Sequence, residues 1–442
     1  MNDIMENKNT ERTGNAMSEK KAVVLGGGGS RGAYEIGVWK LLDEIGYDYR
    51  IVTGSSVGAL NGAVMAMGDV ELGESMWLKI STEMILDYTP QGDITDPENQ
   101  RQAALELIEK AIRSKSIDQS PLRALLEEVI DTRKVCSSDI ALGIVTTKYP
   151  SLRGKEVFAD EIGPEKLIDY LMASSACFPA MRAYEINGEQ YIDGGFYDVL
   201  PINLAISRGA DEIIAVDLKS PGLHLRPSSD DVKITFIEPR TDLGFLLLFE
   251  PNIARTNIAR GYFDAKKALG LADGFNYTFE KEAFGDGEDR FRTLLMRILG
   301  SRGNASERII AETQYKLLSL KLIQNTSAEF LKKGTALPAA ETTGKLFEIN
   351  PLTEYTKEEF DRAVLCALDA VKDLELLKNP DLSTAFKTVT DEKYIAKYLV
   401  REIRRCIEDN QDMSPAIAAA VGLYPSALIG AVYCIYAVMK KQ

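Results

Sequence analysis

The feature that most restricts the fold of this chain is an order of strand, glycine-rich turn and helix that occurs twice near its start. An apolar run at residues 21–25 leads into four consecutive glycines, and the following AYEIGVWKLLDEIG has apolar residues at helical spacing. The segment RIVTGSSVGALNGAVMAMG repeats this order, with a strand-like beginning and a helix-like end. Repeated strand-to-helix units predict an α/β domain with a mainly parallel sheet.

Apolar spacing along the rest of the chain predicts where this domain ends. The stretch from 74 to 131 has helical periodicity, whereas EIIAVDL at 212–218 is typical of a buried parallel strand. Beyond about residue 240 strand patterns nearly vanish and long amphipathic helices follow. We therefore expect a disordered tail at 1–19, an α/β domain at 20–270 with a helical insert at about 74–131, and a mainly helical C-terminal region at 271–442.

The N-terminal segment and the cysteines indicate the cellular compartment. The first twenty residues are charged and contain no apolar run, so they lack the hydrophobic stretch of a secretory signal. The five cysteines are odd in number and include no CxxC pair, which is typical of buried thiols in a reducing compartment. We expect a cytoplasmic protein.

Residues 414–439 near the C-terminal end contain no charged side chain. Their number would suffice to span a bilayer, but Pro425 splits the run into two pieces that are each too short. A buried helical hairpin is therefore the favoured interpretation. Peripheral membrane contact through 414–439 is the alternative.

The composition excludes several kinds of site. The chain has one histidine and a formal net charge of −14, so a histidine-cluster metal site is impossible and zinc is disfavoured. The acidic balance also argues against a large nucleic-acid surface. We expect no metal, no cofactor and no nucleic-acid partner, while the composition leaves the oligomeric state open.

A serine motif occupies the second strand-to-helix turn. The sequence from Gly54 through Ser56 to Gly58 matches G-x-S-x-G between a strand and a helix. In a nucleophile elbow the serine lies on a strained turn, and the flanking glycines allow the strand and helix backbones to pass close to it. An ordinary glycine-serine turn is the alternative interpretation.

The first glycine loop permits three interpretations. A phosphate-binding P-loop fails, because no suitably spaced glycine is followed by Lys and then Ser or Thr. A dinucleotide fingerprint fits literally with Gly27, Gly29 and Gly32, although the second strand ends in Gly54-Ser55-Ser56 instead of an acidic residue. The third interpretation is an oxyanion hole, since consecutive glycines allow several backbone N–H groups to converge on one developing negative charge.

An aspartate precedes two glycines at Asp193-Gly194-Gly195, after a strand-like QYI. Such a sequence usually forms a turn. If Asp193 faces Ser56, its carboxylate accepts the hydroxyl proton directly, and the two residues form a catalytic dyad that needs no histidine.

Taken in order, these motifs resemble the patatin-like phospholipase family. The resemblance covers roughly residues 20–270 and rests on four blocks: the loop Gly27–Gly32 with Arg31 before its last glycine, the elbow Thr53–Gly58, the block Ala173–Pro179, and the turn Asp193–Gly195. PLRALLEE at 121–128 and GYFD at 261–264 are similar to segments of bacterial relatives. Gly26 departs from the acidic residue often found there, and the helical C-terminal region has no assignable counterpart.

The resemblance implies a three-layer α/β/α sandwich that hydrolyses lipid acyl esters. By it, Ser56 is the nucleophile and Asp193 its base, while Gly27, Gly28 and Gly29 form the oxyanion hole. Arg31, Gly32, Gly54, Gly58, Gly194 and Gly195 are the supporting motif residues. An acyl chain would need an apolar channel, for which 243–249 and 74–131 are candidate linings.

Three other interpretations remain. His224 follows Asp193 in the order of a Ser-Asp-His triad, although it lies in a Pro/Ser/Asp-rich stretch that is typical of an exposed loop. A nucleotide- or dinucleotide-binding module would use only Gly27–Gly32. A non-catalytic scaffold would use the helical half to bind a partner.

Overall fold

The computed structural model describes residues 20–114, 116–285, 289–300, 304–374, 388–409 and 414–439, so the tail expected at 1–19 lies outside it. The described residues form two compact units. The first reaches to Glu238 and includes Gly244–Arg255, and the second comprises Pro239–Leu243 and the chain from Thr256 onward. The two units divide within helix α11 (Pro251–Ala268), and the domain boundary at residue 270 stays a prediction.

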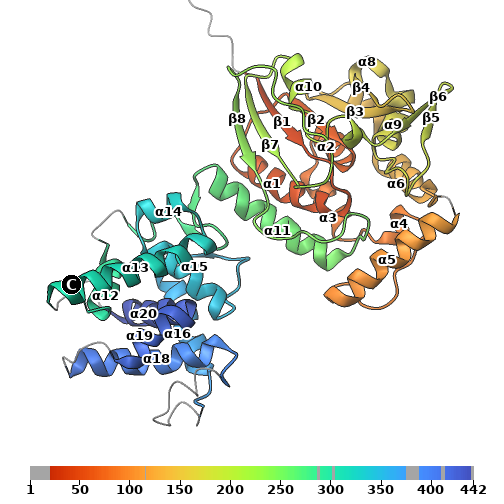
Figure 1. Cartoon of the computed structure of the whole chain (residues 1–442). Coiled ribbons are helices and arrows are strands. Elements are labelled where there is room, and N and C mark those ends of the chain that lie inside the picture. Colours follow the sequence, from red (N-terminus) through yellow and green to blue (C-terminus); the bar gives the residue numbers. More distant parts are fainter. Residues whose placement is uncertain are drawn as a thin grey trace, which may run out of the picture. The chain divides into compact units, whose positions relative to one another are not determined.

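The first unit is built on an eight-stranded sheet with the order β5-β6-β3-β2-β1-β7-β8, in which β4 also pairs with β3 (Figure 1). Pairings among β3, β2, β1, β7 and β8 are parallel, whereas β4, β5 and β6 pair antiparallel. The strands are β1 (Lys21–Leu25), β2 (Ile51–Ser55), β3 (Ala141–Tyr149), β4 (Arg153–Phe158), β5 (Tyr184–Ile186), β6 (Glu189–Ile192), β7 (Glu212–Val216) and β8 (Lys233–Ile237). The predicted mainly parallel sheet is confirmed.

Helices cover both faces of this sheet because alternate residues of its strands point in opposite directions. On one face, α2 (Val57–Met67) packs its Gly62 against Val52 and Leu142. On the other face, α10 (Ile202–Ser207) shares a hydrophobic core with Ala22 and Val24 of β1. The first unit is therefore a three-layer α/β/α sandwich, as the family resemblance implies.

The remaining helices of the first unit lie in its connections. They are the 3-10 turn η1 (Gly29–Gly32), α1 (Ala33–Glu44), α3 (Val70–Trp77), α4 (Thr82–Ile85), α5 (Pro97–Ser114), α6 (Ser120–Val129), α7 (Thr132–Cys136), α8 (Ala159–Ile162), α9 (Pro164–Ser174) and the 3-10 turn η2 (Gly194–Phe196). Helices α3 to α7 occupy the connection from β2 to β3. On α6 the periodic residues Leu122 and Leu126 are buried, which gives this helix an apolar inner face.

The second unit is mainly helical and has its own hydrophobic core, in which Phe279, Phe360 and Tyr433 are fully buried. A small sheet joins β9 (Ala272–Asp273), β10 (Thr278–Glu280) and β11 (Glu354–Tyr355). Its helices after α11 are α12 (Arg290–Ile298), α13 (Ala305–Asn325), α14 (Ala328–Lys333), α15 (Ala336–Leu346), α16 (Lys357–Ala370), α18 (Glu392–Glu408), α19 (Pro415–Leu423) and α20 (Pro425–Val438). A mainly helical C-terminal region is confirmed.

The uncharged segment 414–439 forms α19 and α20, and Pro425 begins the second helix. Leu428, Ile429 and Val432 of α20 are fully buried in the core of the second unit. Within the described residues, no helix combines the length and the apolar character that crossing a membrane requires. The segment therefore has the form of the buried hairpin that its proline indicates.

Candidate active site

Ser56 joins β2 to α2 and so stands at the carboxyl edge of the parallel sheet. Its backbone has a φ of 52°, a left-handed conformation that is rare for residues other than glycine. Strain of this kind persists only where the surrounding structure holds it, and it is common at functional turns. The local geometry is that of a nucleophile elbow.

The flanking glycines of the motif are required by close backbone packing. A Cβ atom on Gly54 would overlap the backbone of Gly58, and a Cβ atom on Gly58 would overlap the backbone of Leu25 in β1. Backbone atoms cannot move away as a flexible side chain can, so any larger residue would displace the strand or the helix. Both glycines thus fix the position of Ser56.

Ser174, the last residue of α9, forms a hydrogen bond with the turn that contains Ser56. Its hydroxyl oxygen accepts a hydrogen bond of 2.9 Å from the backbone N–H of Ser56 and donates one of 2.6 Å to the carbonyl oxygen of Val145. The side chain is fully buried, so losing it would remove the side-chain acceptor of the Ser56 N–H. The family resemblance includes the block at 173–179, but nothing in the sequence predicts this contact across 118 positions.

Asp193 follows β6, and its buried carboxyl group lies close enough to the Ser56 side chain for a hydrogen bond from it to lower the pKa of the carboxyl group. Its Oδ1 atom also accepts a hydrogen bond of 2.8 Å from the backbone N–H of Gly195. Burial raises the pKa of Asp193 from 3.8 to about 6, although these two hydrogen bonds act in the opposite direction. A Cβ on Gly194 would overlap Ser55 and Val145, so this glycine allows Asp193 to approach the elbow.

The glycine loop between β1 and α1 lies beside Ser56. Of the three predicted oxyanion residues, Gly27 uses its N–H to donate a hydrogen bond of 2.8 Å to the carbonyl oxygen of Val199. The hydrogen bonds found among the described residues include no acceptor for the N–H groups of Gly28 and Gly29. Gly29 has a φ of 54°, and a Cβ there would overlap the carbonyl oxygen of Leu246. In this loop, Gly28 and Gly29 are therefore the two glycines whose N–H groups have no acceptor among the hydrogen bonds of the described residues.

A cavity of about 400 Å³ contains Ser56, Asp193 and the three glycines Gly27–Gly29 in its wall. Most of the remaining lining is apolar: Leu60 and Val64 of α2, Met76 and Trp77 of α3, Ile80 and Ile85, Leu122, Leu125 and Leu126 of α6, Ile130, Phe178, Met181, and Leu246, Leu247 and Phe249. Both linings expected from the sequence, 243–249 and the helical insert, contribute to it. Such a wall suits an apolar part of a bound molecule.

A buried polar network below the glycine loop was missed by the sequence analysis. The amide nitrogen of Asn61 donates to the Gly32 carbonyl oxygen at 3.0 Å and to Glu35 Oε2 at 2.8 Å. The Trp77 indole N–H donates to Asn61 Oδ1 at 3.0 Å. Burial raises the pKa of Glu35 well above its usual value, against the effect of the Asn61 amide and the Gly26 backbone. The network connects the glycine loop and α1 to the wall of the cavity.

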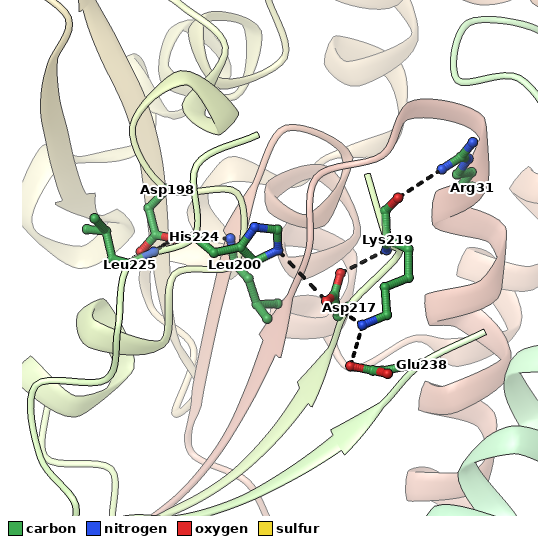
Figure 2. Close-up of polar contacts among 8 residues, drawn as sticks. All are labelled: Arg31, Asp198, Leu200, Asp217, Lys219, His224, Leu225 and Glu238. Atoms are coloured by element: carbon green, nitrogen blue, oxygen red, sulfur yellow. Dashed lines mark hydrogen bonds and ion pairs between the residues drawn. The ribbon is translucent and has the colours of Figure 1, made fainter. Parts of the chain in front are cut away.

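Two loops contribute residues to the wall of this cavity, and Arg31 contacts both segments; Figure 2 shows its contact with Lys219. Its Nε donates to the carbonyl oxygen of Gly244 at 2.9 Å, and its NH1 donates to that of Lys219 at 3.3 Å. The ammonium group of Lys219 in turn pairs with Asp217 at 3.3 Å and with Glu238 at 2.6 Å. The basic residue of the glycine motif therefore holds the loops that follow β7 and β8.

Asp198 connects one of these loops to the turn that carries Asp193. Its Oδ1 accepts hydrogen bonds from the N–H groups of Leu200 at 3.3 Å and Leu225 at 3.4 Å (Figure 2). The carboxyl group is buried, and burial raises its pKa to about 7. Asp198 thus helps to fix the loop that contains His224.

His224 lies apart from the serine and aspartate of the site. Its side chain is 44% exposed, and its Nε2 atom lies 3.8 Å from Asp217 Oδ2 (Figure 2). His224 is not among the residues that line the cavity. This position favours the dyad over a triad that includes the histidine.

The described residues contain no cluster of three or more His, Cys, Asp or Glu side chains that could hold a metal ion. At the carboxyl end of β2, where a dinucleotide site needs an acidic side chain, the chain has Ser55 and Ser56. The glycines of this loop line an apolar cavity whose wall also includes Ser56. The observed surroundings of this loop therefore favour the oxyanion interpretation.

Comparison with known proteins places these observations in a family. A model described as Patatin-like phospholipase matches residues 23–206. An uncharacterized NTE family protein of Mycobacterium tuberculosis is 30% identical over 225 residues, which are 50% of this chain and 54% of that protein. Human patatin-like phospholipase domain-containing protein 6 is 26% identical over 212 residues, 47% of this chain and 14% of that protein. The chain thus spans about half the length of the mycobacterial relatives it matches.

Among solved structures, VipD from Legionella pneumophila aligns with 96% of this chain and 92% of its own, at 13% identity and a TM-score of 0.34. At this score the two chains share no close overall superposition, so the assignment rests on the sequence matches.

The fold and the site define a class, which is an α/β protein with a serine on a strand-to-helix turn in contact with an aspartate. The family match covers the strands and turns that carry Ser56 and Asp193. Residues 23–206 match the patatin-like phospholipase model, which agrees with the resemblance found in the sequence.

Proposed function

We propose that this protein is a serine acyl hydrolase that cleaves lipid esters, with Ser56 as nucleophile and Asp193 as base. The observation that carries the proposal is that Ser56 and the buried Asp193 line the same apolar cavity, close enough for the Ser56 side chain to lower the pKa of the Asp193 carboxyl group. The match of residues 23–206 to the patatin-like phospholipase model supports the same reaction class. A Ser-Asp dyad can carry out this reaction without a histidine.

Acylation begins when Ser56 Oγ attacks the ester carbonyl carbon and its proton passes to Asp193. The electron pair of the carbonyl bond moves onto the oxygen, where the N–H groups of Gly28 and Gly29 stabilise the negative charge. When the tetrahedral intermediate collapses, the bond to the leaving oxygen breaks, and that oxygen takes the proton from Asp193. The products are an alcohol and an acyl-Ser56 ester.

Deacylation repeats these steps with water. Asp193 accepts a proton from the water molecule as its oxygen attacks the acyl carbon, and the same two N–H groups hold the second oxyanion. Ser56 leaves with the proton that Asp193 returns, and a free carboxylic acid is released. The aspartate is therefore unchanged after a full cycle.

The apolar lining of the cavity supports an acyl chain as the bound part of the substrate. Phospholipids and other long-chain esters contain such an acyl chain. A cytoplasmic location and membrane contact through 414–439 stay predictions. In that segment only Leu423, Val438 and Met439 have large apolar side chains that are exposed.

Labelling with a fluorophosphonate followed by mass spectrometry tests the proposal. We expect a phosphonyl adduct on Ser56, no adduct in Ser56→Ala, and strongly reduced labelling and ester hydrolysis in Asp193→Asn. His224→Ala is the matched control and should keep its activity. If His224→Ala abolishes turnover while Asp193→Asn keeps it, the dyad is wrong.

A further inference from the structure

Three large apolar side chains are exposed around the opening of the cavity, and they come from three separate segments. Phe196 of η2 is 44% exposed, Leu223 is 51% exposed, and Phe245 is 42% exposed. Phe196 itself lines the cavity, Leu223 follows the lining residues Pro221 and Gly222, and Phe245 precedes Leu246 and Leu247. We refer to Phe196, Leu223 and Phe245 as the rim.

The backbone of each rim segment is fixed, although the side chains are exposed. Leu223 donates its N–H to the carbonyl oxygen of Gly195 at 3.0 Å and accepts a hydrogen bond from Val199 N–H at 2.7 Å. The carbonyl oxygen of Phe245 accepts a hydrogen bond of 2.7 Å from the hydroxyl group of Ser30. Arg31 then connects the two loops through Lys219 and Gly244, as described above. Large apolar side chains held outward on fixed loops mark a contact surface.

The geometry points to the rim as the surface by which this protein docks on a lipid layer, so that an ester passes from the layer directly into the cavity. This inference rests on the proposed function, because a lipid substrate is what makes the cavity opening face a membrane or micelle. A protein bound permanently to the rim would cover Phe196, which is part of the cavity wall. Phe196 is both exposed and part of the cavity wall, so apolar surface continues from the rim into the cavity at this residue.

The charges beside the rim predict which lipids it prefers. Lys219 is paired with Asp217 and Glu238, and His224 lies against Asp217. Lys219 and His224 are thus offset by carboxylates, Arg31 donates to backbone carbonyl oxygens, and the whole chain is acidic. Attraction to anionic headgroups is therefore small, and docking depends on apolar burial.

Vesicle sedimentation with the full chain tests the inference. The probe is phosphatidylcholine vesicles, alone and mixed with phosphatidylserine, and the protein carries Ser56→Ala so that no lipid is consumed. We expect similar binding to both compositions. The double variant Leu223→Ser/Phe245→Ser should bind roughly 30-fold more weakly, because each side chain loses about half the transfer free energy of a large apolar residue.

A matched control is the double variant Ile45→Ser/Phe236→Ser, since these residues are 43% and 46% exposed in the same unit but do not line or adjoin the cavity. Ile45 follows α1 and precedes β2, so it lies at the amino edge of the sheet, opposite Ser56. The control should bind vesicles like the parent. Circular dichroism and thermal unfolding establish that both double variants are folded.

Three results would overturn the inference: no binding by the parent protein, equal loss in the control, or unchanged binding by the rim variant. Loss of a dimer instead of vesicle binding in the rim variant would identify the rim as a protein interface and overturn it as well. Hydrolysis of a short water-soluble ester distinguishes the docking inference from the proposed function. The rim variant should keep this activity, because Leu223 and Phe245 do not line the cavity. If the wild type cleaves no ester, the proposed function is wrong, regardless of the result of the vesicle-binding experiment.

Discussion

At the scale of single residues, the environment of Asp193 decides whether a carboxylate can act as the base. A base works best when its pKa is near the working pH, and burial raises the pKa of Asp193 to about 6. The carboxyl group must be ionised to accept the proton of Ser56. Activity should therefore rise with pH through about 6 and level off above 7.

The pH profile of kcat/KM on a water-soluble ester, between pH 5 and 8, measures this rise. His224→Ala leaves Ser56 and Asp193 in place and should give the same profile. A flat profile in the wild type, or a profile that His224→Ala removes, would contradict the assignment of the base.

The raised pKa of Asp193 also makes the free energy of unfolding depend on pH. The folded-state pKa of Asp193 lies above the unfolded value of 3.8, so between these values the folded state binds more protons and stability falls as pH rises. Above pH 6 the cost levels off at about 3 kcal/mol. Asp193→Asn removes the charge with little change in shape, and we expect it to be more stable than wild type by about 1–3 kcal/mol at pH 7.5.

Urea unfolding at pH 4 and at pH 7.5 checks this expectation, since the advantage of Asp193→Asn should be present at pH 7.5 and small at pH 4. The control is Asp48→Asn, whose carboxyl group is 73% exposed and should change stability little at either pH. An advantage of Asp193→Asn that is equal at both pH values would exclude ionisation as its cause.

At the scale of elements, the turn between β2 and α2 depends on the absence of side chains. A Cβ on Gly54 meets the backbone of Gly58, which cannot move without shifting α2. Gly54→Ala should therefore lower the free energy of unfolding by about 3 kcal/mol or more and reduce labelling of Ser56. Chemical unfolding and fluorophosphonate labelling measure the two effects.

The control for this substitution is Gly62 on α2, the helix that follows the turn. A Cβ on Gly62 would meet only the side chains of Leu142 and Val52, at 2.9 and 3.1 Å, and these can adjust. Helix propensity favours alanine there by about 1 kcal/mol, so Gly62→Ala should change stability little and leave labelling intact. Equal losses in both variants would argue against backbone packing as the reason for Gly54.

The sequence predicted the local elements around Ser56 but not the long-range contacts that hold them. Strand, turn and helix are adjacent in sequence around Ser56, so the pattern of apolar residues and glycines was sufficient to predict them. The contact from Ser174 to Ser56, by contrast, spans 118 positions, and that from Ser30 to Phe245 spans 215. Contacts of this kind follow from how the sheet brings strands together, which local patterns do not encode.

The sequence and the structure also differ in how they distinguish the three glycines of the proposed oxyanion loop. The run of glycines indicates a loop that can present N–H groups, and it predicts Gly27, Gly28 and Gly29 equally. Only the structure distinguishes them, because the N–H of Gly27 donates to Val199, a residue that the loop meets through the fold. The proposed assignment to Gly28 and Gly29 therefore depends on tertiary packing.

At the scale of the whole molecule, the two units have separate hydrophobic cores. The core of the second unit contains buried residues from Tyr277 onward, whereas the cores that include β1, β3 and α10 consist of residues from the first unit. Units with separate cores can unfold in separate steps. The uncharged segment 414–439 belongs to the second core, which accounts for its apolar composition by burial.

Leu428 of α20 provides the test of this separation, because its side chain is fully buried in the second core. We expect Leu428→Ala to destabilise the second unit by about 2–5 kcal/mol through the cavity it leaves, and to leave the first unit unchanged. Hydrogen exchange measured by peptide should then accelerate in α15, α18 and α20, the helices packed around Leu428, but not in β1, β2 and β3. Leu423→Ala, which is 58% exposed on the neighbouring helix, is the control and should have little effect. Faster exchange in both units of Leu428→Ala would mean that the two cores unfold together, and then Gly54→Ala should also accelerate exchange in α20.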